Sequence, residues 1–211
     1  MPQPKPPPEP EHDRAWQRIY GRFEPLTPLE LQELLRGFER PWWLVGGYAI
    51  EAFTGVRREH EDIDMCIFVE DVPAFRAYLE PRFHLWSNDG GTFRFFDEKH
   101  PEPLSPLSQI WLREHADAPW IIDCILNPTV DGKWQNKRDR EHVADLGEVT
   151  WVAGDGIRYL KPEIALFLKA NSNRASQQWD WEVALPLLSD GARAWLDEML
   201  ERQKQGLLRH G

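Results

Sequence analysis

Short apolar runs, separated by turn residues and amphipathic segments, make up most of the chain up to about residue 160. Apolar runs of this kind, bounded by glycine, proline, asparagine or aspartate, are typical of buried strands. The cluster Asn-Asp-Gly-Gly at 88–91 favours a tight turn and predicts a β-hairpin. We expect strands at residues 43–45, 63–69, 83–86, 92–96, 120–126, 149–152 and 157–160.

Helical signals lie between these strands and dominate after Pro162. Thr27, Pro28 and Glu30 form the pattern of a capping box with proline in the first turn, which opens a helix. Gly55 can end a helix in the left-handed conformation. The highly charged stretch 133–148 is expected to be exposed. We expect helices at residues 13–23, 28–38, 48–53, 72–79, 181–188 and 192–203, with another starting after Pro162 and Ser189 or Asp190 capping the last.

The pattern divides the chain into three parts. Residues 1–10, MPQPKPPPEP, offer little apolar surface and are expected to form a disordered, proline-rich tail. Residues 11–160 mix helices and strands in one main domain, and residues 161–211 are mainly helical. At 211 residues the chain is long enough to build one sizeable core.

Charge and cysteine content narrow the functional classes. The formal net charge of −10 repels nucleic-acid backbones and attracts cations, so we expect no nucleic-acid partner. Two cysteines in apolar runs do not suggest a disulfide framework. No run reaches the roughly 18 apolar residues that a membrane-spanning helix needs, and the N-terminal stretch does not resemble a signal peptide. We therefore expect a cytoplasmic protein without a membrane partner, and the sequence leaves monomer and homodimer open.

Three aspartates are the candidate catalytic and metal-binding residues. Asp62 and Asp64 project from the same strand face, where they repel each other unless a cation lies between them. Oxygen ligands of this kind suit Mg²⁺. Asp123 lies inside the apolar run 121–126, where a lone acid is costly to bury without a partner or a metal. The alternative readings are a turn cap for Asp62 and Asp64, and a satisfied polar group at a sheet end for Asp123.

A glycine pair indicates where a phosphate could bind. Gly46 and Gly47 lie where a predicted strand passes into a helix, so backbone N–H groups can approach an anion at the helix N-terminus. The pair could also simply make a tight turn.

The order of these motifs resembles the nucleotidyltransferase superfamily with the polymerase β-like fold. Residues 45–50 (VGGYAI) and 58–64 (REHEDID) look most like the small aminoglycoside and lincosamide nucleotidyltransferases, and residues 159–170 resemble the stretch that opens their helical part. The resemblance implies an α+β nucleotidyltransferase fold, with a mixed β-sheet flanked by helices and followed by a mainly helical C-terminal part. Many relatives carry Lys-Asp where this chain has Ser-Gln-Gln at 176–178, and Asp180 would partly substitute for that acid.

The resemblance also implies roles for individual residues. Asp62 and Asp64 would hold the metal, with two Mg²⁺ ions expected, and Asp123 would be either a third metal ligand or the base that takes the proton of the attacking hydroxyl. The remaining implied nucleotide-binding residues are Gly46 and Gly47, which would cradle the triphosphate, together with Arg58, His60 and Lys169. For Arg58 and His60 the alternative is an ion pair with a nearby acid.

The expected function is transfer of a nucleoside monophosphate from an NTP co-substrate to a hydroxyl of a small cationic acceptor such as an aminoglycoside, with release of pyrophosphate. Acids such as Glu98, Glu102 and Asp131 could concentrate such an acceptor. Two alternatives keep the fold. One is a toxin-type enzyme that modifies tRNA or protein, for which Lys133, Lys137, Arg138 and Arg140 could form a basic strip; the other is an inactive nucleotide-binding scaffold.

Overall fold

The computed structural model describes residues 17–101 and 104–208 of the 211-residue chain. The predicted tail at 1–10 lies outside the described residues, as does the first part of the helix predicted at 13–23, of which residues 17–20 are helical.

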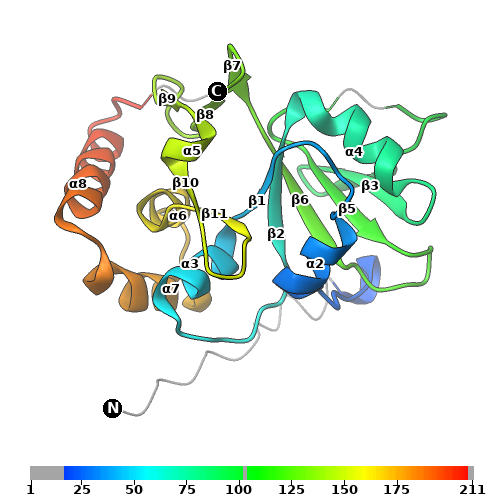
Figure 1. The fold of residues 1–211 in the computed structure, drawn as a ribbon, viewed down its shortest axis with the longest axis horizontal. Coiled ribbons are helices and arrows are strands. Elements are labelled where there is room, and N and C mark those ends of the chain that lie inside the picture. The colour runs from blue at the N-terminus through cyan, green and yellow to red at the C-terminus, as the bar shows by residue number, and fades with distance from the viewer. Residues whose placement is uncertain (1–16, 102–103, 209–211) are drawn as a thin grey trace.

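An eight-stranded mixed sheet forms the centre of the fold (Figure 1). Its strand order is β10-β11-β1-β2-β6-β5-β3-β4. The pairs β1–β11 and β2–β6 are parallel and the other neighbours are antiparallel. The predicted α+β class with a mixed sheet is therefore confirmed. The strands are β1 (Trp42–Leu44), β2 (Asp64–Phe68), β3 (His84–Asp89), β4 (Thr92–Phe95), β5 (Gln109–Arg113), β6 (Ile122–Asn127), β10 (Thr150–Val152) and β11 (Arg158–Leu160).

The sequence analysis did not predict β5, and it assigned residues 88–91 to the hairpin turn, which is shorter in the structure. Only Gly90 and Gly91, both with positive φ, form the turn, while Asn88 and Asp89 belong to β3 and pair with β4. A two-residue turn with positive φ at both positions matches the twist of the flanking strands. Strand β5 pairs with β3 and β6 and carries two residues that contact Asp123.

Helices pack on both faces of the sheet, and each face has its own core. Helices α2 and α4 cover one face, where Leu31 and Phe75 are fully buried among strand residues such as Met65. Helices α6 and α8 contribute Phe167 and Leu196 to the second core. Figure 1 shows α6, α7 and α8 gathered at the β10–β11 end of the sheet. The helices are α2 (Pro28–Leu34), α3 (Gly46–Thr54), α4 (Val72–Leu79), α5 (Leu146–Val149), α6 (Pro162–Lys169), α7 (Ala175–Ala184) and α8 (Asp190–Lys204).

The predicted helix ends are confirmed where local chemistry sets them. Thr27 and Glu30 form both bonds of the capping box, and the Ser189 hydroxyl accepts a bond from the Ala192 N–H at the start of α8. Gly55 ends α3 in the left-handed conformation. Helix α2 ends earlier than predicted, at Leu34, and α7 begins earlier, at Ala175, because neither position carries a strong capping signal.

The prediction that residues 133–148 are exposed is wrong for Trp134, Asn136 and Asp139, which are buried, but holds for most of its charged residues. This stretch contributes β8 (Lys133–Gln135), β9 (Val143–Ala144) and α5, and β8 pairs with β7 (Thr129–Val130) in a small second sheet. Trp134 is buried in the second core, and the buried Asp139 is paired with Arg202 of α8 at 3.0 Å. The buried charge of Asp139 is compensated by Arg202 on the C-terminal helix.

Both cysteines are buried and free, as expected from their low number. No helix within the described ranges is long and apolar enough to cross a membrane.

Candidate active site

Strand pairing places two of the predicted carboxylates side by side. Strands β2 and β6 are parallel neighbours, and their register sets Asp64 opposite Asp123. Asp64 lies on the face of β2 that also carries Cys66 and Phe68, the face packed against the C-terminal helices. Asp62 lies two residues before Asp64, and its negative charge acts on both other carboxylates.

Burial and mutual repulsion shift the pKa of both carboxylates upward. Burial, followed by the charge of Asp62, raises the pKa of Asp64 to about 7, and the nearby cations Lys169 and Arg58 oppose this shift. Burial and then the charge of Asp64 raise the pKa of Asp123 well above its usual range. Its Oδ1 atom is buried without a hydrogen-bond partner among the residues that the structure describes. Carboxylates in this state favour a bound cation or proton between them.

The aspartate carboxylates fit a metal ion that also takes ligands from the substrate. Across residues 17–101 and 104–208, no three Asp, Glu, His or Cys side chains are grouped so as to hold a metal ion by themselves. Mg²⁺ commonly takes only one or two protein carboxylates and completes its coordination with water and substrate phosphates. Asp64, together with Asp62 or Asp123, could supply such a pair, and the three-aspartate metal site remains a prediction.

Gly46 is the first residue of α3 and lies directly against the Asp64 side chain. Its φ is +64°, and a Cβ atom there would lie 2.9 Å from Cγ of Asp64, with the carboxylate oxygen closer still. The backbone is held against the same residue because the Val45 N–H donates to the Asp64 carbonyl at 3.0 Å. At Gly47 a Cβ atom would lie 2.9 Å from Cζ of Arg58 and 2.8 Å from Nδ1 of His60. Both glycines therefore let the α3 N-terminus approach residues of the predicted site.

A single buried acid on α7 joins two of the predicted phosphate-binding cations. The Asp180 side chain is 1% exposed, and its Oδ1 lies 3.1 Å from Arg58 Nε. Its Oδ2 accepts a hydrogen bond from Lys169 at the end of α6. Arg58 and Lys169 thus converge near Asp64, where both lower its pKa. Asp180 therefore fixes both cations, and its substitution for the acid found in relatives stays a prediction.

Replacing Asp180 with asparagine should reduce the free energy of unfolding by about 3 kcal/mol, because it leaves two largely buried cations without their acid. Urea denaturation measures this change. The matched control is Asp197→Asn, which breaks an exposed pair with Arg193 and should cost under about 1 kcal/mol. Equal effects of the two substitutions would contradict the buried role of Asp180.

His60 has a supporting position next to the glycine pair. Its ring stacks on Tyr48 with centroids 3.7 Å apart, and its Nε2 lies 2.8 Å from Glu51 Oε2. Burial lowers the pKa of His60, and the hydrogen bond with Glu51 opposes that shift. The alternative reading of His60, a pair with a nearby acid, is therefore present as the contact with Glu51, and its nucleotide-binding role stays a prediction.

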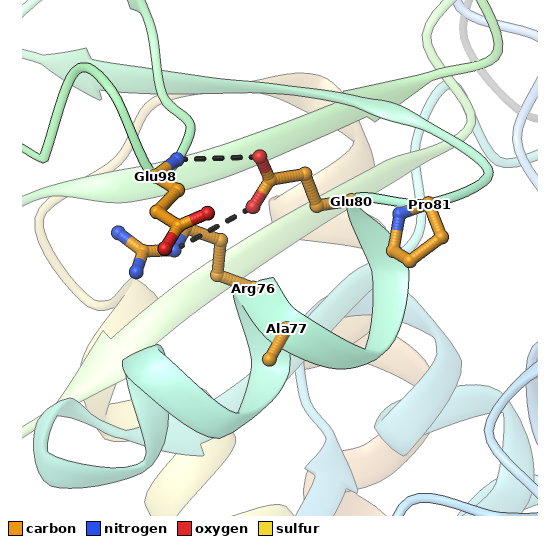
Figure 2. A pocket seen from close by; sticks show the side chains of 5 residues that line it. All are labelled: Arg76, Ala77, Glu80, Pro81 and Glu98. Atoms are coloured by element: carbon orange, nitrogen blue, oxygen red, sulfur yellow. Dashed lines mark hydrogen bonds and ion pairs between the residues drawn. The ribbon is translucent and has the colours of Figure 1, made fainter.

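The structure does not bring Glu98 or Asp131, two of the predicted acidic residues, to this site. Glu98 lies in an open depression beside α4, where its backbone N–H donates to Glu80 Oε1 at 3.2 Å and Glu80 also pairs with Arg76 (Figure 2). Asp131 occupies the turn between β7 and β8, and Glu102 lies outside the described residues.

Of the four residues in the basic strip considered for a tRNA partner, Lys133 and Arg140 are exposed, and Lys137 and Arg138 are half-buried. Lys133 pairs with Asp145 at 3.2 Å, and the Arg138 guanidinium donates to the Phe167 carbonyl at 3.0 Å. Lys137 is partly buried, and its charge acts on Asp123. No observation therefore favours the tRNA-modifying alternative.

Sequence reasoning missed the residues of β5 that surround Asp123. Gln109 donates to Asp123 from this strand, and Trp111, which pairs in register with Asp123, acts on its carboxylate and lowers its pKa. The available signal was the apolar run Ile110-Trp111-Leu112 between the polar residues Gln109 and Arg113, which is typical of a buried strand.

Comparisons with known proteins agree with this fold. A family model described as aminoglycoside-2''-adenylyltransferase matches residues 29–95, the segment from α2 to β4 that contains Gly46, Asp62 and Asp64. No curated protein sequence matches the chain significantly.

Solved structures of antibiotic-modifying proteins share the fold over most of their length. A solution structure of the antibiotic-resistance factor ANT(2'')-Ia aligns with a TM-score of 0.54 and 16% identity, covering 85% of this chain and 91% of that one. A crystal structure of ANT(2'')-Ia in complex with adenylyl-2''-tobramycin gives a TM-score of 0.52 at 15% identity, covering 83% and 95%. The lincosamide antibiotic adenylyltransferase LnuA, bound to lincomycin, gives 0.50 at 19% identity, covering 75% and 96%.

The chain therefore has the fold of a nucleotidyltransferase. The family match over residues 29–95 agrees with the predicted resemblance to aminoglycoside nucleotidyltransferases, and the structures share the fold.

Proposed function

We propose that the protein is a Mg²⁺-dependent nucleotidyltransferase that moves a nucleoside monophosphate from an NTP to a hydroxyl of a small cationic acceptor such as an aminoglycoside. The observation that carries this proposal is the pairing of Asp64 with Asp123 beside the α3 N-terminus, with Asp123 Oδ1 buried and unpartnered within the described structure.

Each part of the reaction has a candidate residue. In the transfer, the acceptor oxygen forms a bond to the α-phosphorus, the bond from that phosphorus to the bridging oxygen breaks, and pyrophosphate leaves. Asp62 and Asp64 would hold Mg²⁺, which supplies charge neutralisation at the phosphates when bound. Asp123 Oδ1 either accepts the proton of the acceptor hydroxyl or completes the metal site.

The phosphate-binding roles rest on the positions of the glycines and cations. The α3 N-terminus offers backbone N–H groups to an anion, and Gly46 and Gly47 let it lie directly against Asp64 and Arg58. Arg58 and Lys169 are fixed by Asp180 within electrostatic reach of Asp64. Cations held in place before binding can stabilise phosphate charge without reorganisation during the reaction.

Two observations support a cationic acceptor: the family match to aminoglycoside-2''-adenylyltransferase and the net charge of −10. A negative overall field concentrates polycationic ligands near the protein. The support comes from the whole chain and not from a local acidic cleft at Glu98 and Asp131.

Binding and turnover test this function separately. Mg²⁺ with an NTP should raise the melting temperature, since a ligand at about 100 times its Kd stabilises a fold by about 2.7 kcal/mol. Pyrophosphate release is then measured with ATP or GTP and a panel of aminoglycosides and lincosamides. A thermal shift without acceptor-dependent pyrophosphate would support the nucleotide-binding scaffold instead.

A further inference from the structure

Of the two Asp123 oxygens, only Oδ2 has a described partner at hydrogen-bond distance, although the Trp111 side chain also acts on the carboxylate. Gln109, on the neighbouring strand β5, donates from Nε2 to Asp123 Oδ2 at 3.0 Å. The other oxygen, Oδ1, is buried and has no hydrogen-bond partner among the described residues. The two oxygens of this carboxylate are therefore inequivalent before any substrate binds.

A hydrogen-bonded series sets the direction of the Gln109 amide. The Gly91 N–H donates to Asn88 Oδ1 at 3.0 Å, and Asn88 Nδ2 donates to Gln109 Oε1 at 3.1 Å. A backbone N–H can only donate, so the Asn88 oxygen must face Gly91 and its amide nitrogen must face Gln109. Gln109 then presents its own oxygen to Asn88 and its nitrogen to Asp123.

The fold keeps this series in place. Asn88 is 9% exposed and pairs in register with Gln109 across β3 and β5. Gly90 and Gly91 form the tight turn of the β3–β4 hairpin, which fixes the donor at its start. A series that begins at a rigid backbone donor and ends at a buried carboxylate has only one satisfied arrangement.

We propose that Gln109 and Asn88 are positioning residues that hold Asp123 through Oδ2 and direct Oδ1 to the acceptor hydroxyl. This inference rests on the proposed function and adds to it the residues that orient Asp123. Gln109 stabilises the carboxylate in one orientation, and Asn88 acts only through Gln109.

Steady-state kinetics test the proposal with two variants. Gln109→Leu removes the donor to Asp123 and should lower kcat by about 10- to 100-fold while the KM for the NTP changes less than about twofold. Asn88→Asp keeps the size of the side chain, but a carboxylate there accepts from Gly91 and cannot donate to Gln109. Asn88→Asp should also lower kcat, and the double variant should be no slower than Gln109→Leu alone.

The matched control is Gln205→Leu, because Gln205 also donates to a carboxylate, that of Glu201, on the exposed surface of α8. It should keep the kcat of the unmodified protein. An unchanged kcat in Gln109→Leu, or effects of the two site variants that multiply in the double variant, would overturn the positioning role.

A second readout does not depend on turnover. In the unmodified protein the side-chain amide protons of Gln109 should exchange slowly with solvent in NMR spectra, and Asn88→Asp should speed that exchange at least about tenfold. Equal exchange in both proteins would overturn the hydrogen-bonded series. Absence of turnover in the unmodified protein together with slow exchange would instead overturn the proposed function and leave the series standing.

Discussion

Replacing Asp64 with asparagine should abolish nucleotidyl transfer, with a loss of at least about 1,000-fold in kcat. The substitution keeps the size of the side chain but removes the charge that faces Asp123 across the β2–β6 pair. Stabilisation of phosphate charge is the main contribution of such a site, and an amide cannot supply it through a metal. Pyrophosphate release under saturating NTP measures the loss.

The same substitution should leave the fold intact and raise its stability at pH 8 without metal. The pKa of Asp64 is about 7 in the folded protein and lower in the unfolded chain, so the unfolded state binds fewer protons between about pH 4 and 7. Stability therefore falls as the pH rises through this range, and the cost is complete above it. Asparagine removes that cost.

Melting temperatures at pH 5 and pH 8, in buffer with a chelator, measure the effect on stability. The surface variant Asp197→Asn is the control and should show no such pH-dependent gain. Full activity in Asp64→Asn would contradict the metal-binding role of Asp64. A variant that is unfolded at both pH values would show that Asp64 is structural.

Replacing Gly46 with alanine should lower kcat by about 100-fold or more. A Cβ atom at this position meets the Asp64 carboxylate, so either α3 or the carboxylate must shift. Displacements of about 1 Å in a catalytic group can cost about this much in rate. The residue also has a φ of +64°, which costs a non-glycine residue about 1 kcal/mol or more.

The variant Gly55→Ala separates the effect of the positive φ from the effect of the contact with Asp64. Gly55 has a similar φ of +69°, but no atom would lie within 4 Å of an added Cβ. The strained backbone should therefore lower the free energy of unfolding by a comparable amount in both variants, while only Gly46→Ala should lose activity. Equal kinetic losses would mean that helix strain, and not contact with Asp64, explains the glycine.

Local chemistry in the sequence was sufficient to predict several parts of the site. The cost of burying an acid in an apolar run singled out Asp123, which the register sets opposite Asp64. Strand β2 begins at Asp64, so the shared strand face of Asp62 and Asp64 stays a prediction. The capping box at Thr27 and the cap at Ser189 were also predictable, because their partners lie within three residues.

Features that depend on strand register could not be predicted in the same way. The contact between Gln109 and Asp123 requires β5 to pair with β6, and the sequence contains no local signal for that pairing. The burial of Asp139 likewise depends on Arg202, which is far away in the chain. The acids at Glu98 and Asp131 were read from composition alone, and the structure places them beside other elements.

The mass of the acceptor after reaction tests the central claim most directly. The protein is incubated with Mg²⁺, ATP or GTP and each aminoglycoside, and the acceptor is analysed by mass spectrometry beside a reaction with Asp64→Asn. The account predicts that an acceptor gains the mass of one nucleoside monophosphate with the unmodified protein and stays unchanged with the variant. An unmodified acceptor across the whole panel, or equal modification by the variant, would contradict it.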